Sequence, residues 1–482
     1  MSVAAQVAKA HEAFLMAQDH SLEERAHWLE AAASALESRR DELVRVALRE
    51  THLPEARLNN ELTRTVFQFQ LLAREVRRGE FLDATIDHKD PDWGMGPRPD
   101  VRRVNVPLGV VGVFGASNFP FAFSVAGGDS ASALAAGCAV VHKIHGAHPE
   151  LGELTTEILT AGLEKAGAPE GIFSSVTGRE AGIELVEHPQ IKAVGFTGSI
   201  PGGRALFDRA TSRAEPIPFY GELGSINPVV VTEQAWATRA EQIAEGFVGS
   251  MTMGIGQFCT KPGLVFVPES AAQRATEAIT EKLQAVELPG KMLNERIRDG
   301  FLESRHRVSQ LKDVDTIASG DESNPPEPSV FIAEARELGE DSEVLHTEMF
   351  GPAAVIIRYR DQDELLRVLG CLPGQLTGTI HAEDGEPIDQ LMATLAQRCG
   401  RLVKNGWPTG VTVSYAQHHG GPYPATTALG TSVGTAAVAR FLRPVAFQDF
   451  ADAELPPAIR ENNALDLRRR VDGTWQNCGV DA

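Results

Sequence analysis

The sequence has 482 residues, which suggests two or three domains with enough interior for large cores. Its 43% hydrophobic and 23% charged content is ordinary for a globular protein, and no run of about 18 apolar residues predicts a membrane span. The net charge of -20 argues against nucleic acid or an anionic membrane surface as a partner.

The five cysteines are scattered and show no C-x-x-C spacing, which argues against a disulfide framework and against a zinc site. The first residues contain neither a basic nor an apolar segment, so we expect no signal peptide. Both observations predict a protein of the reducing cytoplasm. The cysteines are Cys138, Cys259, Cys371, Cys399 and Cys478.

Residues 3–79 have the apolar spacing of helices, and Ser21-Leu-Glu-Glu24 predicts a capping box at the start of one of them. Residues 83–87 and 101–106 then predict two exposed strands around a connection rich in Pro, Gly and Asp. Because the edges of such a hairpin are unpaired, it is either an oligomerisation element or a plain surface hairpin.

From residue 108 onward, short apolar strands alternate with helices, and a second α/β unit begins after residue 225. This pattern predicts doubly wound parallel sheets, which bind ligands at the carboxyl ends of their strands. The first unit has expected strands at 108–114, 139–141, 172–176 and 191–196, and expected helices at 125–137, 149–167, 180–187 and 204–213.

Three segments suggest chemistry, each with a plain structural alternative. Thr197-Gly-Ser-Ile-Pro-Gly-Gly203 opens a helix and suits a phosphate group, although a turn with an N-cap explains it about as well. Glu222 lies between glycines ahead of a strand, and it is either an ordinary turn residue or a catalytic base. Cys259, in the glycine-flanked segment 254–263, is either a nucleophile or a buried structural cysteine.

Residues 405–435 predict a long loop rich in Gly, Pro, His and Thr, and long loops inside compact domains are usually functional. His418 and His419 suggest a metal, but a third clustered ligand is lacking, so we expect no metal site. Residues 450–482, which include Arg468-Arg-Arg470, predict a solvated tail.

Five short motifs follow one another along the chain: Ser117-Asn-Phe-Pro120, Phe196-Thr-Gly-Ser199, Glu222-Leu-Gly-Ser-Ile-Asn-Pro228, Gly256-Gln-Phe-Cys-Thr-Lys-Pro-Gly263 and Glu348-Met-Phe-Gly-Pro352. In this order they resemble the aldehyde dehydrogenase superfamily over nearly the whole chain. Each is weak alone, and their shared order carries the resemblance. More narrowly, residues 114–129, 147–149, 254–260 and 419–427 are similar to a branch with 2-oxoglutarate semialdehyde (2,5-dioxopentanoate) dehydrogenases and a fatty aldehyde dehydrogenase.

The resemblance implies a role for each motif. Cys259 would attack the aldehyde to form a thiohemiacetal, Asn118 would bind the developing oxyanion, and Glu222 would activate the water that hydrolyses the thioester. The implied cofactor is NADP or NAD. Its expected contacts are Lys143 and His145 at the adenosine ribose, Gly198 and Ser199 at the pyrophosphate, and Glu348 and Phe350 at the nicotinamide riboside.

Two positions depart from the common pattern. Gly146 stands where many NAD-preferring members have Glu, which removes a repulsion of a 2′-phosphate, so we expect NADP to be accepted. Lys261 stands where Asn is common.

The substrate implied by the resemblance is an aldehyde. We favour 2-oxoglutarate semialdehyde, with a medium-to-long-chain aliphatic aldehyde as the second choice. An anionic substrate needs an Arg or several N–H donors, which the sequence does not identify. The expected pocket wall, with core packing as the alternative for each residue, is Phe119, Phe258, Trp407 and Pro422. A catalytically silent binding protein and a thiol hydrolase with a histidine base are the alternatives of another class.

The same resemblance implies a Rossmann-type α/β cofactor domain, an α/β catalytic domain and a small β oligomerisation element. The expected cofactor domain spans 1–82 and 108–224, and the catalytic domain spans 225–430. Strands in 83–107 and 438–449 would form the oligomerisation element of a homodimer or homotetramer.

Overall fold

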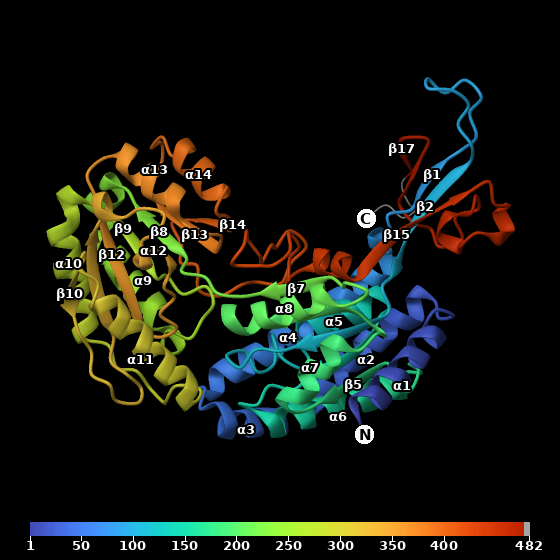
Figure 1. Cartoon of the computed structure of the whole chain (residues 1–482), viewed down its shortest axis with the longest axis horizontal. Helices are drawn as coiled ribbons and strands as arrows, with labels where there is room; N and C mark the ends of the chain where they lie inside the picture. The colour runs from blue at the N-terminus through green and yellow to red at the C-terminus, as the bar shows by residue number, and fades with distance from the viewer. Residues whose placement is uncertain (477–482) are drawn as a thin grey trace.

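The chain folds into two α/β lobes and a projecting arm (Figure 1). The structure, a computed structural model, describes residues 1–476, so Cys478 lies outside the described part. One lobe holds the N-terminal half of the chain, the other holds most of the second half, and the arm extends from the far end of the first lobe.

The first lobe is built on a five-stranded sheet in which every pairing is parallel. Its central strand is buried along its whole length, which explains the continuous apolar run of its sequence. The strand order is β5 (Phe173–Val176), β4 (Ala139–Lys143), β3 (Val110–Phe114), β6 (Ile191–Thr197) and β7 (Phe219–Glu222).

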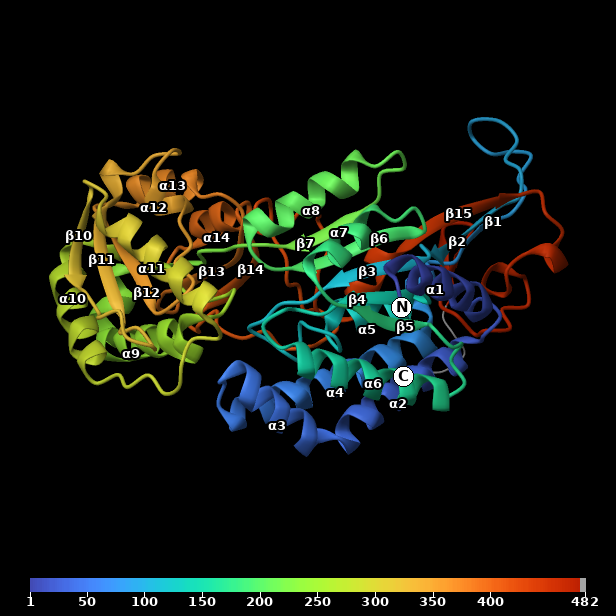
Figure 2. The same ribbon diagram turned by 60° about the horizontal axis from the view of Figure 1, so that its bottom comes forward.

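Helices cover both faces of this sheet, as the predicted doubly wound fold requires (Figure 2). One face carries α1 (Val3–Ala17), α7 (Arg179–Glu187) and α8 (Ile200–Ser212). The other carries α5 (Gly128–Ala136) and α6 (Pro149–Lys165), backed by the N-terminal helices. These are α2 (Leu22–Ser38), α3 (Arg40–Thr51) and α4 (Glu55–Arg78), and the predicted capping box at Ser21 and Glu24 is confirmed at the start of α2.

The second lobe contains a seven-stranded sheet that is parallel except for its first pair. Its order is β10 (Val314–Ala318), β11 (Ser329–Glu334), β12 (Ala353–Tyr359), β9 (Leu264–Pro268), β8 (Pro228–Val231), β13 (Gln375–His381) and β14 (Cys399–Lys404). Its helices are α9 (Glu233–Thr252), α10 (Glu269–Gln284), α11 (Glu295–Ser309), α12 (Glu343–His346), α13 (Gln362–Cys371) and α14 (Asp389–Ala396).

The arm is a third sheet, and both strands of the predicted hairpin are paired in it by other parts of the same chain. β15 (Leu442–Gln448) lies beside β2 (Val101–Pro107), and β16 (Arg469–Val471) lies beside β1 (Thr85–Asp87). The outer strands are β15 and β17 (Thr474–Gln476). The edges that the sequence left unpaired are therefore partly covered within the chain.

The prediction of a solvated tail beyond residue 450 is wrong for the described residues. Leu455, Ile459 and Leu467 are buried in a small core with Ile86 and Val104. The three arginines are also structured: the Arg469 guanidinium donates to the carbonyls of Arg460 and Glu461, while Arg468 and Arg470 lie over the Trp475 ring. A charged segment can hide a few apolar residues that complete another element's core, which composition alone does not reveal.

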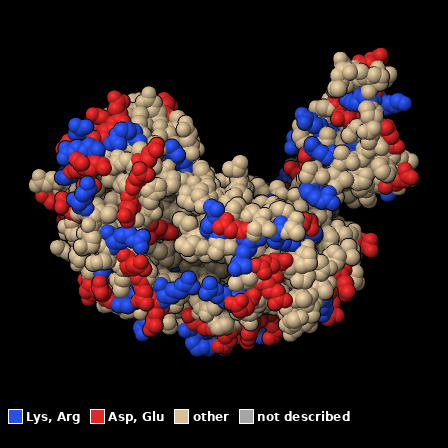
Figure 3. All heavy atoms as spheres, viewed as in Figure 1, with Lys and Arg blue, Asp and Glu red and all other residues tan. Residues whose placement is uncertain are grey.

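In the described part of the chain, no helix combines the length and the apolar character that crossing a membrane requires. The space-filling view shows acidic and basic side chains interspersed over both lobes, with no broad patch of one sign on that face (Figure 3).

Candidate active site

Cys259 lies in a turn between the short helix η2 (Met253–Gly256) and β9, the central strand of the second lobe's sheet. Gly254, Ile255 and Gly256 have φ angles of 58°, 59° and 67°, in the left-handed region that glycine enters most easily. A Cβ on Gly256 would lie 2.2 Å from the carbonyl carbon and oxygen of Gly351. The glycines of the cysteine motif thus let this turn pack directly against the turn at 348–352.

Asn227 holds the Cys259 turn in place from the neighbouring strand end. Its Nδ2 donates to the carbonyl oxygens of Cys259 (2.8 Å) and Lys261 (2.9 Å), and its Oδ1 accepts from the Thr377 hydroxyl (2.9 Å). Asn227 is fully buried. One residue of the Glu222 motif therefore positions the nucleophile's backbone, a role that the motif alone did not reveal.

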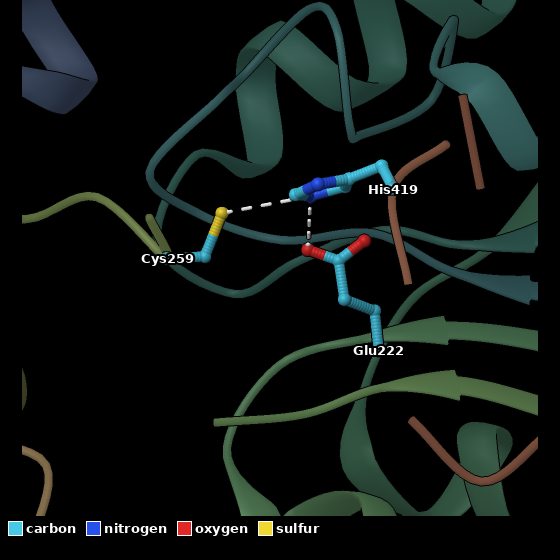
Figure 4. A group of neighbouring side chains, drawn as sticks. All are labelled: Glu222, Cys259 and His419. Carbon is cyan, nitrogen blue, oxygen red and sulfur yellow. Dashed lines mark hydrogen bonds and ion pairs between the residues drawn. The ribbon is translucent and has the colours of Figure 1, made fainter. Parts of the chain in front are cut away.

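Glu222, the last residue of β7, and His419, from the long loop, meet beside the Cys259 sulfur (Figure 4). His419 Nε2 lies 2.9 Å from Glu222 Oε1 and 3.8 Å from Cys259 Sγ. Ser432 donates its hydroxyl to the other carboxylate oxygen, Oε2, at 2.7 Å. Glu222 is only 3% exposed, so these hydrogen bonds replace the water that the carboxylate has lost.

The two reacting groups have pKa values shifted in opposite directions. Burial alone would raise the pKa of Glu222, but His419, Ser432 and the contact with Cys259 outweigh it and lower that pKa below its ordinary value. Burial, and after it the charges of Glu222 and Glu348, raise the pKa of the Cys259 thiol well above its ordinary value. The pocket thus holds an ionised carboxylate next to a neutral thiol, an arrangement in which the carboxylate accepts the thiol proton.

The histidine geometry differs from that of a thiol hydrolase. In a hydrolase triad, one imidazole nitrogen faces the nucleophile and the other faces the acid. Here Nε2 faces both Cys259 and Glu222, while the buried Nδ1 has no hydrogen-bond partner among the described residues. His419 Nε2–H donates to the carboxylate, so the ring cannot pass a proton from sulfur to Glu222 through its two nitrogens.

The structure also changes the metal interpretation of the two histidines. One ligand atom each from Glu222, Cys259 and His419 lies within 4.8 Å of the other two, whereas His418 is not part of this group. The two candidate ligands beside His419 are therefore the acid and the thiol of the catalytic interpretation.

Asn118 lies in the loop after β3, and its side chain points to the residues just before Cys259. Its Nδ2 donates to the Gln257 carbonyl at 3.1 Å, which uses one of its two N–H groups. Arg57 donates to the Asn118 carbonyl at 2.6 Å and so fixes this loop from helix α4.

A cavity of about 350 Å³ opens beside Cys259. Phe119, Phe258 and Phe123 form much of its wall, together with His419. Helix α4 contributes two guanidinium groups, Arg57 and Arg64, and the carboxyl group of Glu61; the remaining lining residues are Asn60, Met253, Thr260, Gly410 and Val411. The sequence predicted Phe119 and Phe258 for the pocket wall but none of the charged residues.

Trp407 and Pro422 do not line this cavity, and we correct that part of the prediction. The Trp407 ring packs on His381 (centroids 4.7 Å apart) and Phe247, in the second lobe's core. The Pro422 carbonyl accepts a hydrogen bond from the Ala425 N–H in the loop. For both residues the plain alternative, packing within the fold, holds.

A profile of the aldehyde dehydrogenase family matches residues 1–444. The chain belongs to the aldehyde dehydrogenase family. It is 45% identical over 472 residues to alpha-ketoglutaric semialdehyde dehydrogenase 2 of Azospirillum brasilense, covering 96% of this chain and 90% of that one. It is 42% identical over 472 residues to alpha-ketoglutaric semialdehyde dehydrogenase of Acinetobacter baylyi, covering 96% and 89%.

Solved structures show the same fold. Gamma-glutamyl-gamma-aminobutyraldehyde dehydrogenase of Burkholderia cenocepacia superimposes with a TM-score of 0.78 at 20% identity, covering 92% of this chain and 88% of that one. Proline utilization A of Bradyrhizobium japonicum gives 0.78 at 25% identity, covering 92% of this chain and 44% of that one. This aldehyde dehydrogenase therefore has the predicted fold, and enzymes of its family use NAD or NADP.

The predicted cofactor residues of the first lobe follow its strand ends, as an α/β cofactor site requires. Lys143 ends β4, where burial lowers the pKa of its ammonium group, and His145 follows, stacked on His148. Gly198 and Ser199 precede α8, and Ser199 caps this helix by accepting from the Gly202 N–H. A helix N-terminus of this kind fits a pyrophosphate.

The nicotinamide side of the predicted site lies in the turn at 348–352, close to Cys259. A Cβ on Gly224 would lie 2.6 Å from Glu348 Oε2, which places this carboxyl group against the Glu222 motif. Burial raises the pKa of Glu348 to about 7, and Lys261 partly opposes this rise. Lys261 donates to the Ala353 carbonyl, and burial lowers its pKa to about 8. Phe350 is half-buried in the same turn.

Lys261 therefore lies in the electrostatic field of a predicted cofactor residue. From the sequence, Lys261 was notable only because it stands where Asn is common. Arg57 and Arg64 were missed as site residues altogether, and His419 was considered only for a metal or for a hydrolase base. For the two arginines, the one available signal was their spacing with Glu61 on one face of a helix.

Proposed function

We propose that this aldehyde dehydrogenase oxidises 2-oxoglutarate semialdehyde (2,5-dioxopentanoate) to 2-oxoglutarate. Two relatives that are 42–45% identical over nearly the whole chain carry the name of this activity. The structural observation that favours an anionic aldehyde is the pair of guanidinium groups, Arg57 and Arg64, in the cavity that contains Cys259.

The first chemical step belongs to Cys259 and Glu222. The neutral thiol gives its proton to the ionised carboxylate as the sulfur attacks the aldehyde carbon, which forms a C–S bond and a thiohemiacetal. The second N–H of Asn118 and the backbone N–H of Cys259 would bind the developing oxyanion, each contributing about 3 kcal/mol.

The nicotinamide, when bound, supplies the acceptor for the hydride of the former aldehyde carbon. This oxidation leaves a thioester on Cys259. Glu222 releases the thiol proton to solvent and is ionised again. It then takes a proton from the water that attacks the thioester carbon, the C–S bond breaks, and the leaving sulfur of Cys259 takes up that proton. His419 donates to Glu222 throughout the resting state and holds the carboxylate in its ionised form.

The residues proposed for the cofactor are Lys143 and His145 at the adenosine end, Gly198 and Ser199 at the pyrophosphate, and Glu348 and Phe350 at the nicotinamide end. Gly146 is exposed, and a Cβ built there would meet nothing within 4 Å. This open position beside Lys143 supports the proposal that a 2′-phosphate, and therefore NADP, is accepted.

The test is the absorbance of reduced nicotinamide with NADP and with NAD, using 2-oxoglutarate semialdehyde and hexanal as substrates. We expect a higher kcat/KM for the oxo acid and loss of turnover in Cys259→Ala. The apolar wall of Phe119, Phe123 and Phe258 favours the second candidate, a medium-to-long-chain aliphatic aldehyde, and preference for hexanal would establish it. Cofactor binding without turnover of either aldehyde would instead support a catalytically silent protein.

We also propose that the cofactor unit comprises 1–82 and 108–224, the catalytic unit 225–430, and that the arm joins subunits into a homodimer or homotetramer. The arm's outer strands β15 and β17 and its exposed Trp93, Met95 and Phe450 support this role. Light scattering of the wild type and of Phe450→Glu tests it.

A cytoplasmic location is proposed because Cys138, Cys259, Cys371 and Cys399 are free thiols.

A further inference from the structure

Arg57, Glu61 and Arg64 lie at positions i, i+4 and i+7 of α4, which places them on one face of the helix. This face points into the cavity that contains Cys259, and all three residues line it. They are the charged residues of that lining, two cationic and one acidic. The cavity wall beside the nucleophile therefore carries an excess of positive charge.

Arg64 presents an unused guanidinium edge. Its Nε donates to the Val411 carbonyl at 3.1 Å, which fixes one side of the group. Its Nη1 and Nη2 are buried and have no hydrogen-bond partner among the described residues. The guanidinium carbon lies 5.2 Å from the centre of the Phe123 ring, which orients the plane of the group. Buried donors without partners are costly, so these two nitrogens need a partner, and a ligand in this cavity can supply one.

The neighbouring acid does not use this edge. Glu61 Oε1 accepts from the backbone N–H groups of Phe121 (2.8 Å) and Ala122 (2.9 Å). Neither carboxylate oxygen is bonded to Arg64, and Oε2 has no partner in the described structure. Glu61 thus anchors the loop after Asn118 and leaves the two terminal nitrogens of Arg64 free.

The other arginines near Cys259 have different tasks. Arg57 donates to the Asn118 carbonyl, and its guanidinium carbon lies 5.0 Å from the centre of the Phe119 ring and 4.6 Å from that of the Phe258 ring. Arg401 uses Nη1 and Nη2 on the carbonyls of Gly410 and Pro408. Both groups hold loops in place, whereas Arg64 has both terminal nitrogens available.

We propose that the Nη1–Nη2 edge of Arg64 binds the carboxylate of an oxo-acid aldehyde and thereby directs its aldehyde carbon toward Cys259. Two parallel N–H groups match the two oxygens of a carboxylate, which a lysine ammonium cannot reproduce. Arg64 and Cys259 line the same cavity, so one substrate can contact both residues. This inference rests on the proposed function and names the group that gives it specificity.

The test compares wild type, Arg64→Gln and Arg64→Lys on two five-carbon aldehydes, 2-oxoglutarate semialdehyde and pentanal, at saturating cofactor. For Arg64→Gln we expect kcat/KM to fall roughly 100-fold on the oxo acid, as two lost charge-assisted hydrogen bonds imply, and to stay within about threefold on pentanal. Arg64→Lys keeps the charge without the fork and should lose about tenfold on the oxo acid alone.

Retained turnover of pentanal shows that Arg64→Gln is folded. Arg74→Gln, the same change at an exposed position of the same helix, is the matched control and should alter neither substrate. A readout independent of turnover is the thermal shift caused by the product 2-oxoglutarate, which should be present in the wild type and Arg74→Gln and lost in Arg64→Gln.

The outcomes separate this inference from the proposed function. If the wild type prefers the oxo acid but Arg64→Gln loses both substrates equally, or neither, the proposed function stands and the role of Arg64 is overturned. If the wild type shows no preference for the oxo acid over pentanal, the substrate assignment itself fails and the carboxylate site with it. Selective loss on the oxo acid, with loss of the 2-oxoglutarate shift, supports both.

Discussion

Two groups of charged side chains close to Cys259 differ in how their polar atoms are used. In the acid cluster of Glu222, His419 and Ser432, both carboxylate oxygens accept hydrogen bonds from the protein. In the α4 cluster of Arg57, Glu61 and Arg64, several buried guanidinium nitrogens have no partner among the described residues. The carboxylate of the first cluster has both oxygens hydrogen-bonded before any ligand arrives and is suited to chemistry. The second cluster has unused donors and is suited to recognition.

The strongest way to test the acid cluster is Glu222→Gln, which keeps the shape of the side chain and removes its basicity. If Glu222 activates the hydrolytic water, steady-state kcat should fall by about 10²–10⁴-fold. Stopped-flow measurement should still show a first-turnover burst of reduced nicotinamide, because thioester formation precedes hydrolysis. The burst should be slower than in the wild type, because Glu222 also accepts the thiol proton in the first step. Cys259→Ala should show no burst, and a burst in Glu222→Gln as fast as that of the wild type would remove the glutamate from the first step.

His419→Gln tests whether the cluster's hydrogen bonds tune the base. His419 lowers the pKa of Glu222, so its removal should raise that pKa and move the acid limb of the kcat–pH profile to higher pH. We expect kcat near pH 7 to fall roughly tenfold to 100-fold and to recover in part above pH 8. A uniform loss at every pH, with no shift of the limb, would mean that His419 only maintains structure.

The reactivity of the Cys259 thiol tests how Glu222 affects the pKa of the neighbouring sulfur. Burial and the charge of Glu222 raise the pKa of Cys259, so its alkylation by iodoacetamide should still accelerate above pH 9. In Glu222→Gln that pKa should fall, and labelling at pH 7.5 should be about tenfold faster. Mass spectrometry of the Cys259 peptide measures this, with Cys259→Ala defining the background at other thiols. Slower labelling in Glu222→Gln would show that the carboxylate promotes thiolate formation more than its charge opposes it.

The smallest expected effect concerns Lys261 and Glu348, a pair outside the cavity lining. Because Glu348 has a pKa of about 7, it loses its charge as pH falls below 7, and the KM for cofactor should rise there. Lys261 lowers this pKa, so Lys261→Met should shift the rise to higher pH and increase the cofactor KM at pH 7 about threefold. Cofactor titrations between pH 6 and 9 measure the shift. Equal KM values for the two proteins at every pH would remove Glu348 from the ribose contact.

The comparison of the two clusters also shows where sequence reasoning reaches its limit. Cys259, Glu222 and Asn118 lie in short motifs, and the structure brings the first two together with His419. His419 was considered only for a metal or for a hydrolase base, because nothing in the Gly-rich loop indicates where its ring points. Its position depends on hydrogen bonds between its backbone and Thr431 and Ser432, farther along the same loop.

The sequence by itself determined the alternation of strands and helices, the capping box of α2 and the polar, glycine-rich segment around Cys259. These follow from local periodicity, caps and backbone freedom, which neighbouring residues dictate. Only the tertiary structure decided that Arg64 and His419 lie beside Cys259, that Trp407 and Pro422 do not, and that residues beyond 450 complete the arm. Those facts depend on contacts between strand ends and helix faces that are far apart in the sequence. Local periodicity does not predict such long-range contacts.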